Sequence, residues 1–251
     1  MLAPIALGTT MLLGLHPAGI TIQTRYVTWT IGPDGRNLTF RDHRTGKDWL
    51  HPASGSVAFF ASRQGVHILP TSVTRHGDRV DVVFGQNQTS VVFTVRETSE
   101  AIFFEIASIS GDLDELTFGT APLTLRGLPE EPIAVCALAR NLKTNVPELP
   151  GASSMLRAIA YRRLRFEGAS AAFIAVPPAQ LRRALQRVVE ASPELPKSPV
   201  GGPWALDSPD NHRSYLFNFG GLNASTAGPW IELAHALGAT QIDFHGGTSF
   251  R

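Results

Sequence analysis

Across residues 20–173, apolar and polar positions alternate in short runs that are separated by turn residues. The run "TIQTRYVTWTIG" at 21–32 shows this period of two, and "AIFFEIASI" at 101–109 repeats it. Turn residues follow at Pro33-Asp34-Gly35 and around Gly46, while helical periodicity is absent from the whole region. Many short strands with regular turns are typical of an antiparallel sandwich or barrel. The pattern therefore predicts a mainly β domain over residues 20–175.

The pattern changes to that of a helix at "PPAQLRRALQRVVEASPEL", residues 177–195. Two prolines suit the start of a helix. An apolar stripe runs along one face, with arginines and glutamine opposite; it consists of Leu181, Leu185, Val188 and Val189. A proline-rich stretch follows, so we predict that residues 176–212 are a helix and a linker between two domains.

Residues 213–251 have the pattern of strand, helix and strand. "SYLFNFG" and "TQIDFHGG" have the length of strands, and the segment between them has Ser225 or Thr226 as a candidate N-cap and Gly238 at its C-terminal end. Such a βαβ unit favours parallel pairing with a right-handed crossover. One unit cannot bury both faces of its sheet. Either the unit packs on the sandwich, or it begins an α/β barrel that is incomplete in this chain; we expect the second for residues 213–251.

Composition narrows the classes of function. The 251 residues carry a net charge of +1, with 43% hydrophobic and 17% charged residues, which indicates a globular core and argues against a nucleic-acid partner. A single cysteine, Cys136, excludes an intrachain disulfide and a cysteine-based zinc site. Serine-hydrolase, Walker, zincin and dinucleotide-binding motifs are absent from the sequence.

Residues 1–19 contain an apolar stretch followed by small residues, which resembles a secretory signal. No Lys or Arg precedes the stretch, although secretory signals normally carry one there. Pro4, Gly8 and Gly14 interrupt the stretch, and it is too short to span a bilayer. A ragged N-terminal strand is the alternative. The signal hypothesis predicts a secreted or periplasmic protein without a membrane span.

Candidate chemistry lies at the ends of the two C-terminal strands, where ligands bind in α/β barrels. Asn218 ends the first strand, and Asp243 and His245 end the second, on one face by the alternation of side chains. Trp204 could stack on a sugar ring. Hydrogen bonding at the mouth of the sheet is the alternative role for Asp243 and His245. A D-x-H pair without a third ligand does not make a metal site, and we predict no metal and no cofactor.

Two segments carry a resemblance to a known family. "IGPDGRNLTFRDHRTGKDWL" at 31–50 and "ISGDLDELTF" at 109–118 resemble the galactose-mutarotase-like β-super-sandwich that precedes the catalytic (β/α)8 barrel in glycoside hydrolases such as α-galactosidase-like and α-glucosidase-like enzymes. The helix, the proline-rich connection and "SYLFNFGG" are similar to the passage into the first barrel strand. The resemblance implies hydrolysis of glycosidic bonds in an oligo- or polysaccharide, by carboxylates that lie mostly beyond Arg251. It identifies no catalytic residue in this chain.

Two alternatives stay open. The first is a non-catalytic carbohydrate-binding sandwich with an exposed aromatic platform, for which Trp29, Trp49 and Trp204 are candidates, although core positions suit Trp29 and Trp49 better. The second is a mutarotase-like epimerase that uses a histidine and a carboxylate of the sandwich; the candidates are His43, His51, His67, His76, Glu97, Glu105 and Glu115.

Overall fold

The computed structural model describes residues 19–53, 55–86, 89–147, 154–205, 207–212, 214–218 and 222–244. The chain divides into two compact units at residues 195 and 196, inside the predicted linker. We call residues 1–195 the sandwich unit and residues 196–251 the C-terminal unit. Residues 1–18 lie outside the described residues, so the signal hypothesis stays a prediction. No described helix combines the length and apolar character that crossing a membrane requires.

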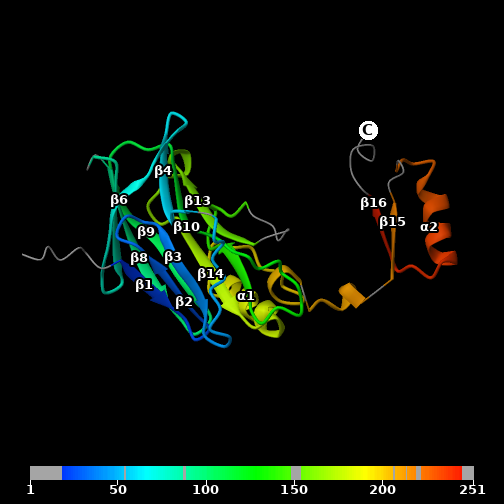
Figure 1. Cartoon of the computed structure of the whole chain (residues 1–251). Coiled ribbons are helices and arrows are strands. Elements are labelled where there is room, and N and C mark those ends of the chain that lie inside the picture. The colour runs from blue at the N-terminus through cyan, green and yellow to red at the C-terminus, as the bar shows by residue number, and fades with distance from the viewer. Residues whose placement is uncertain are drawn as a thin grey trace, which may run out of the picture. The chain divides into compact units, whose positions relative to one another are not determined.

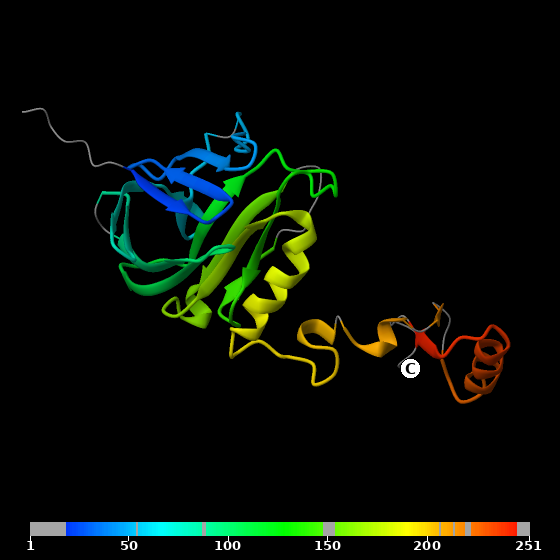
Figure 2. The same cartoon turned by 90° about the horizontal axis from the view of Figure 1, so that it is seen from below.

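The sandwich unit is mainly β, as predicted, and its described strands form three antiparallel sheets (Figures 1 and 2). The first sheet has the order β1 (Ile20–Gln23), β2 (Val27–Ile31) and β3 (Asn37–Asp42). The second has the order β12 (Thr144–Asn145), β13 (Met155–Tyr161), β10 (Glu115–Pro122), β4 (Phe59–Arg63) and β5 (Val66–Ile68). The third has the order β11 (Ala134–Ala139), β14 (Ser170–Val176), β9 (Ala101–Ser110), β8 (Thr89–Glu97), β7 (Arg79–Phe84) and β6 (Pro70–His76).

Aromatic rings from all three sheets meet in one core. Trp29 of the first sheet lies 6.4 Å from Phe104 and 6.2 Å from Phe173 of the third, measured between ring centroids. Phe118 of the second sheet lies 5.5 Å from Phe93 of the third. All five rings are almost fully buried, because alternate residues of each strand point to the same side of the sheet. The period of two in the sequence therefore specifies which side chains make this core.

The predicted turn at Pro33-Asp34-Gly35 is present. The Gly32 N–H donates to the Arg36 carbonyl at 2.7 Å, and the Arg36 N–H donates to Oδ1 of Asp34 at 3.1 Å. Gly35 has a φ of +79°, a conformation that glycine adopts without strain. This turn fixes the register between β2 and β3.

A second glycine is required by packing rather than by a turn. Gly119 lies in β10 at a break in the register with β13, and its φ is +65°. A Cβ atom there would lie 2.0 Å from Cζ of Phe173. The ring of Phe173 thus occupies the space that any larger residue at position 119 would need.

The helix α1 (Pro178–Glu190) packs on the outer face of the six-stranded sheet, where β11 and β14 lie (Figure 2). Its buried residues Ala184 and Val188 join a cluster with Phe103 and Ile174, and Leu181 and Leu185 lie partly buried beside them. The predicted apolar stripe is therefore the face that packs. Nε of Arg187 donates to Glu100 at 3.1 Å, and the Tyr26 hydroxyl donates to Gln180 at 2.9 Å. The helix belongs to the sandwich unit rather than to a free linker.

The C-terminal unit contains β15 (Tyr215–Asn218), α2 (Ala227–Ala236) and β16 (Gln241–Phe244), and the two strands pair in parallel. Short 3-10 turns at Pro203–Ala205 and Pro209–His212 precede them. Thr226 is the N-cap residue of α2. Just before the helix, Oδ1 of Asn223 accepts from the N–H groups of Ser225 and Thr226 at 2.9 and 3.1 Å and shapes the turn that leads into it. Gly238 follows the helix with a φ of +70°, in keeping with its predicted role.

Candidate functional site

The four residues proposed from the sequence all belong to the C-terminal unit. Asn218 is the last residue of β15, Asp243 is the third residue of β16, and Trp204 lies in the Pro203–Ala205 turn. His245 lies outside the described residues, so the predicted sharing of a face by Asp243 and His245 stays a prediction. In the strand register Asn218 pairs with Phe244, whereas Asp243 pairs with Phe217.

Asp243 lines a cleft of about 480 Å³ within the C-terminal unit. Tyr215 pairs with Gln241, and Phe217 pairs with Asp243. Side chains two residues apart in a strand point the same way, so these four share one face of the strand pair, and all four line the cleft. Tyr215 and Phe217 are 62% and 43% exposed. Ala205, Ser208 and Asn211 complete the lining.

The helix α2 covers the opposite face of the same strands. The ring of Trp230 in α2 meets Phe244 of β16 edge-on, with 6.2 Å between the centroids. Phe244 and Asp243 are successive residues of a strand and therefore point to opposite sides. One face of β15 and β16 is thus occupied by a helix, and the other presents aromatic, amide and carboxylate groups.

Hydrogen bonds hold the ends of this unit together. The Thr240 N–H donates to the Ser214 carbonyl at 2.9 Å, and the Ser214 hydroxyl donates to the Gly238 carbonyl at 2.8 Å. These bonds tie the start of β15 to the segment that leads into β16. The side chain of Asn211 donates to the Ala205 carbonyl at 2.6 Å and so fixes the turn at the edge of the cleft.

The chemistry of this face suits the binding of a polyol. Two exposed rings offer apolar surface, and Gln241 and Asp243 offer a donor and acceptors. Glycoside hydrolysis requires two carboxyl groups on either side of the scissile bond. Asp243 is the single carboxylate among the described residues that line this cleft.

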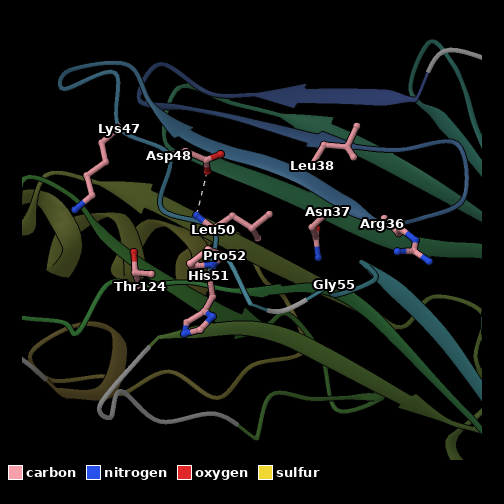
Figure 3. Close-up of a pocket in the computed structure, with 10 residues that line it drawn as sticks. All are labelled: Arg36, Asn37, Leu38, Lys47, Asp48, Leu50, His51, Pro52, Gly55 and Thr124. Atoms are coloured by element: carbon pink, nitrogen blue, oxygen red, sulfur yellow. Dashed lines mark hydrogen bonds between the residues drawn. The ribbon is translucent and has the colours of Figure 1, made fainter.

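A second cleft, of about 710 Å³, lies on the sandwich unit (Figure 3). It is formed by β3, the segment after it and Thr124, and its lining includes Lys47, Asp48 and His51. Oδ1 of Asp48 accepts from the N–H groups of Phe40 at 2.9 Å and Leu50 at 3.0 Å. The carboxylate therefore holds the segment against β3.

Asn37 lines the same cleft but has a structural role. Its Oδ1 accepts from Nε1 of Trp29 at 2.8 Å, and its Nδ2 donates to the Ser56 hydroxyl at 2.8 Å and to the Thr120 carbonyl at 2.9 Å. The side chain joins three segments that are far apart in the sequence. Its amide is occupied by the protein and is not aimed at a ligand.

The sandwich tryptophans do not supply an exposed platform. Trp29 is fully buried, and Trp49 is 6% exposed. Nζ of Lys47 lies 3.7 Å from the centre of the Trp49 ring and covers it. The hypothesis of a sugar platform at Trp29 or Trp49 is therefore wrong, and both residues serve the core.

Two of the residues proposed for an epimerase, His43 and Glu97, are engaged in structural contacts. Both ring nitrogens of His43 have partners, the Thr28 hydroxyl at 2.6 Å and the Arg25 carbonyl at 3.1 Å. Glu97 forms an ion pair with Arg75 at 2.8 Å. Neither His43 nor Glu97 is therefore placed for an acid–base pair.

The described residues offer neither a metal-ligand cluster nor an activated thiol. Among the residues that the structure describes, no group of three or more His, Cys, Asp or Glu side chains is arranged to hold a metal ion. Cys136 lies in β11, and burial raises the pKa of its thiol. A raised pKa lowers the fraction of reactive thiolate.

Comparison with known proteins adds no further assignment. No protein family model matches the chain, and no curated protein matches it. The site therefore rests on its own geometry. Sequence reasoning found Asp243 but missed Tyr215, Phe217 and Gln241, because "SYLFNFG" reads as a uniformly apolar strand. The spacing of Tyr215 and Phe217 by two residues was the available signal.

Proposed function

We propose that this chain is part of a carbohydrate-active enzyme that hydrolyses glycosidic bonds. In this proposal β15, α2 and β16 belong to an α/β barrel that follows the sandwich unit in the chain. The face that carries Tyr215, Phe217, Gln241 and Asp243 is the inner face of that barrel and contacts sugar.

One observation carries the proposal. Two parallel strands have a helix on one face and a polar and aromatic cleft on the other. In an α/β barrel the helices lie outside, and the loops at the carboxyl ends of the strands make the active site. Asp243 is the third of the four residues of β16 and so lies toward its carboxyl end.

The proposed chemistry gives Asp243 a binding role. Sugar rings have apolar faces that stack on aromatic side chains and hydroxyl groups that donate to carboxylates. The pair of carboxyl groups that hydrolysis requires then includes groups from other strands of the barrel. This agrees with what the resemblance to glycoside hydrolases implies.

The proposal can be tested by titrating the full chain with methyl α-galactoside and with maltotriose, and by following binding by NMR. We expect amide shifts in β15 and β16. We expect Asp243→Asn to weaken binding about fivefold or more, because hydrogen bonds to a charged group are stronger than those to a neutral one. Glu232→Gln, which removes an exposed carboxylate of α2, is the matched control. Equal affinity of Asp243→Asn and the unmodified chain would contradict the binding role of this face.

The barrel is tested separately by the DNA that follows the Arg251 codon. Further strand–helix repeats with two carboxylates at strand ends would support it. A stop codon at that point would overturn it.

A carbohydrate-binding module is the second candidate, and the 710 Å³ cleft on the sandwich unit favours it. The same titration separates the two. Shifts confined to residues 36–55 would favour the module, whereas shifts in β15 and β16 would favour the barrel.

A further inference from the structure

Two arginines, Arg96 and Arg140, lie on the six-stranded sheet at the edge of the area that α1 covers. Phe103 of β9 belongs to the cluster that α1 covers. Arg96 of β8 pairs with Phe103 in the strand register, and Phe103 pairs with Ala172 of β14. Arg140 follows β11 directly, and its N–H donates to the Ser170 carbonyl at 2.9 Å. Residues from three neighbouring strands and from the end of a fourth therefore meet on one face.

Both guanidinium groups lie over the same aromatic ring. Cζ of Arg96 is 4.3 Å and Cζ of Arg140 is 5.0 Å from the centre of the Phe103 ring. Phe103 is 8% exposed, so it forms a fixed support beneath the two charges. A guanidinium that stacks on a ring keeps its planar edge of N–H donors for other partners.

Neither guanidinium has a direct salt bridge within the described part of the chain. No described carboxylate forms an ion pair with Arg96 or Arg140, whereas Arg75, Arg79, Arg162 and Arg187 each form at least one. NH1 of Arg140 donates to the Ser170 hydroxyl at 3.1 Å. Its Nε is buried and has no acceptor among the described residues. The donors of this pair are thus only partly used.

The electrostatics at Arg140 agree with this picture. Burial and the nearby charge of Arg96 lower the pKa of the Arg140 guanidinium, and Glu105 offsets this in part. Glu105 is exposed and pairs with Ser170 in the register. Arg140 is partly buried and Arg96 is exposed, and two like charges held over one ring favour an anion between them.

We infer that Arg96, Arg140 and Phe103 form a binding site for the oxyanion group of an acidic saccharide. The oxyanion group is the carboxylate of a uronic acid or a sulfate ester. Both groups have neighbouring oxygen atoms that can accept two hydrogen bonds from one guanidinium. The sugar part of this inference rests on the proposed function, and the anion part rests on the arginine pair alone. Recognition of an acidic substituent would give the protein a selectivity that the face at Asp243, which carries a carboxylate of its own, does not provide.

The test measures binding to the full chain by calorimetry at low and moderate salt. The probes are methyl β-glucuronide, glucose 6-sulfate, methyl β-glucoside and inorganic sulfate. The variants are Arg96→Gln and Arg140→Gln, which remove one charge each. The matched control is Arg163→Gln, because Arg163 is exposed and lies 5.4 Å from the Tyr161 ring without a second arginine on that ring. Circular dichroism verifies that each variant is folded.

We expect the glucuronide or the sulfated sugar to bind and the neutral glucoside to bind at least about tenfold more weakly. Each of Arg96→Gln and Arg140→Gln should weaken the acidic sugar about tenfold or more, and Arg163→Gln should leave it unchanged. The stronger of the two acidic probes identifies a carboxylate or a sulfate as the preferred group.

Two results would overturn the inference. If both variants bind the acidic sugars as tightly as the unmodified chain, the arginine pair is not the site. If inorganic sulfate binds through the pair but neither acidic sugar does, the saccharide assignment is wrong. The proposed function would fail through a different result, in which Asp243→Asn leaves the binding of neutral sugars unchanged. In that case the dependence of sulfate binding on Arg96 and Arg140 can still be measured.

Discussion

The sandwich unit buries its large aromatic side chains in a core, whereas the C-terminal unit leaves large apolar side chains of β15 and α2 exposed. In the sandwich unit Trp29, Phe59 and Phe104 are fully buried. In the C-terminal unit Tyr215 is 62%, Ile231 52% and Leu237 63% exposed. Ala234 is the buried residue of α2. The first unit encloses its core with its own sheets, and the second has both a helix and strands with apolar surface facing outward.

The difference follows from the type of sheet. Antiparallel sheets can stack on one another and leave the outer face to solvent, whereas parallel strands are found almost entirely in sheets covered on both faces. A pair of parallel strands with one helix covers a single face. The exposed rings of β15 therefore support the proposal that this pair belongs to a larger barrel.

The largest expected effect comes from the aromatic core. Trp29→Ala removes the ring that contacts Phe40, Phe104 and Phe173, and should lower the free energy of unfolding by about 3–5 kcal/mol. Ile231→Ala in α2 should change the free energy of unfolding of the sandwich by less than about 0.5 kcal/mol. Urea denaturation followed by circular dichroism measures both. If Trp29→Ala and Ile231→Ala lower the free energy of unfolding by similar amounts, the two units do not differ in how their apolar side chains contribute to stability.

The next effect separates packing from backbone conformation at two glycines. Gly119 and Gly77 have nearly the same φ, +65° and +66°, but a Cβ at Gly119 meets Phe173, whereas a Cβ at Gly77 has no atom within 4 Å. Gly77→Ala should cost about 1 kcal/mol for the left-handed conformation. Gly119→Ala should cost about 3 kcal/mol or more, because overpacking adds to that term. Equal thermal stability of the two variants would show that the core yields to the added methyl group.

The smallest effect concerns a surface ion pair of the sandwich. The Arg79 guanidinium, hydrogen-bonded to the Asp81 carboxylate, lowers the pKa of Asp81. A lowered folded-state pKa adds stability above the ordinary Asp pKa, and this contribution disappears as the pH falls through the folded-state value. Arg79→Gln should therefore raise the pKa of Asp81 in NMR titration and reduce stability slightly at neutral pH. The difference in stability between Arg79→Gln and the unmodified chain should vanish in acid. If it persists there, the stabilising effect of Arg79 comes from packing rather than from the charge of Asp81.

The strand pattern and most turns of the sandwich could be predicted from the sequence. Alternation in "TIQTRYVTWTIG" and glycines at positions 35 and 46 specify local structure that depends on neighbours in the chain. The helix at 178–190 was also predicted, but its packing on β11 and β14 was not, because an apolar stripe does not reveal its partner. The lining of the C-terminal cleft was predicted for Asp243 alone, since the register of β15 with β16 decides which residues stand beside it.

By itself, the sequence determined the mainly β character, the turns, and the strand–helix–strand order of the last residues, because these depend on periodicity and on the conformations that glycine, proline and asparagine allow. Tertiary structure alone decided the rest. Three contacts join segments that are far apart in the chain. Asn37 binds Trp29 and Thr120, the ring of Phe173 packs against Gly119, and Arg96 and Arg140 lie over Phe103. Such contacts depend on sheet order and register, which no local pattern encodes.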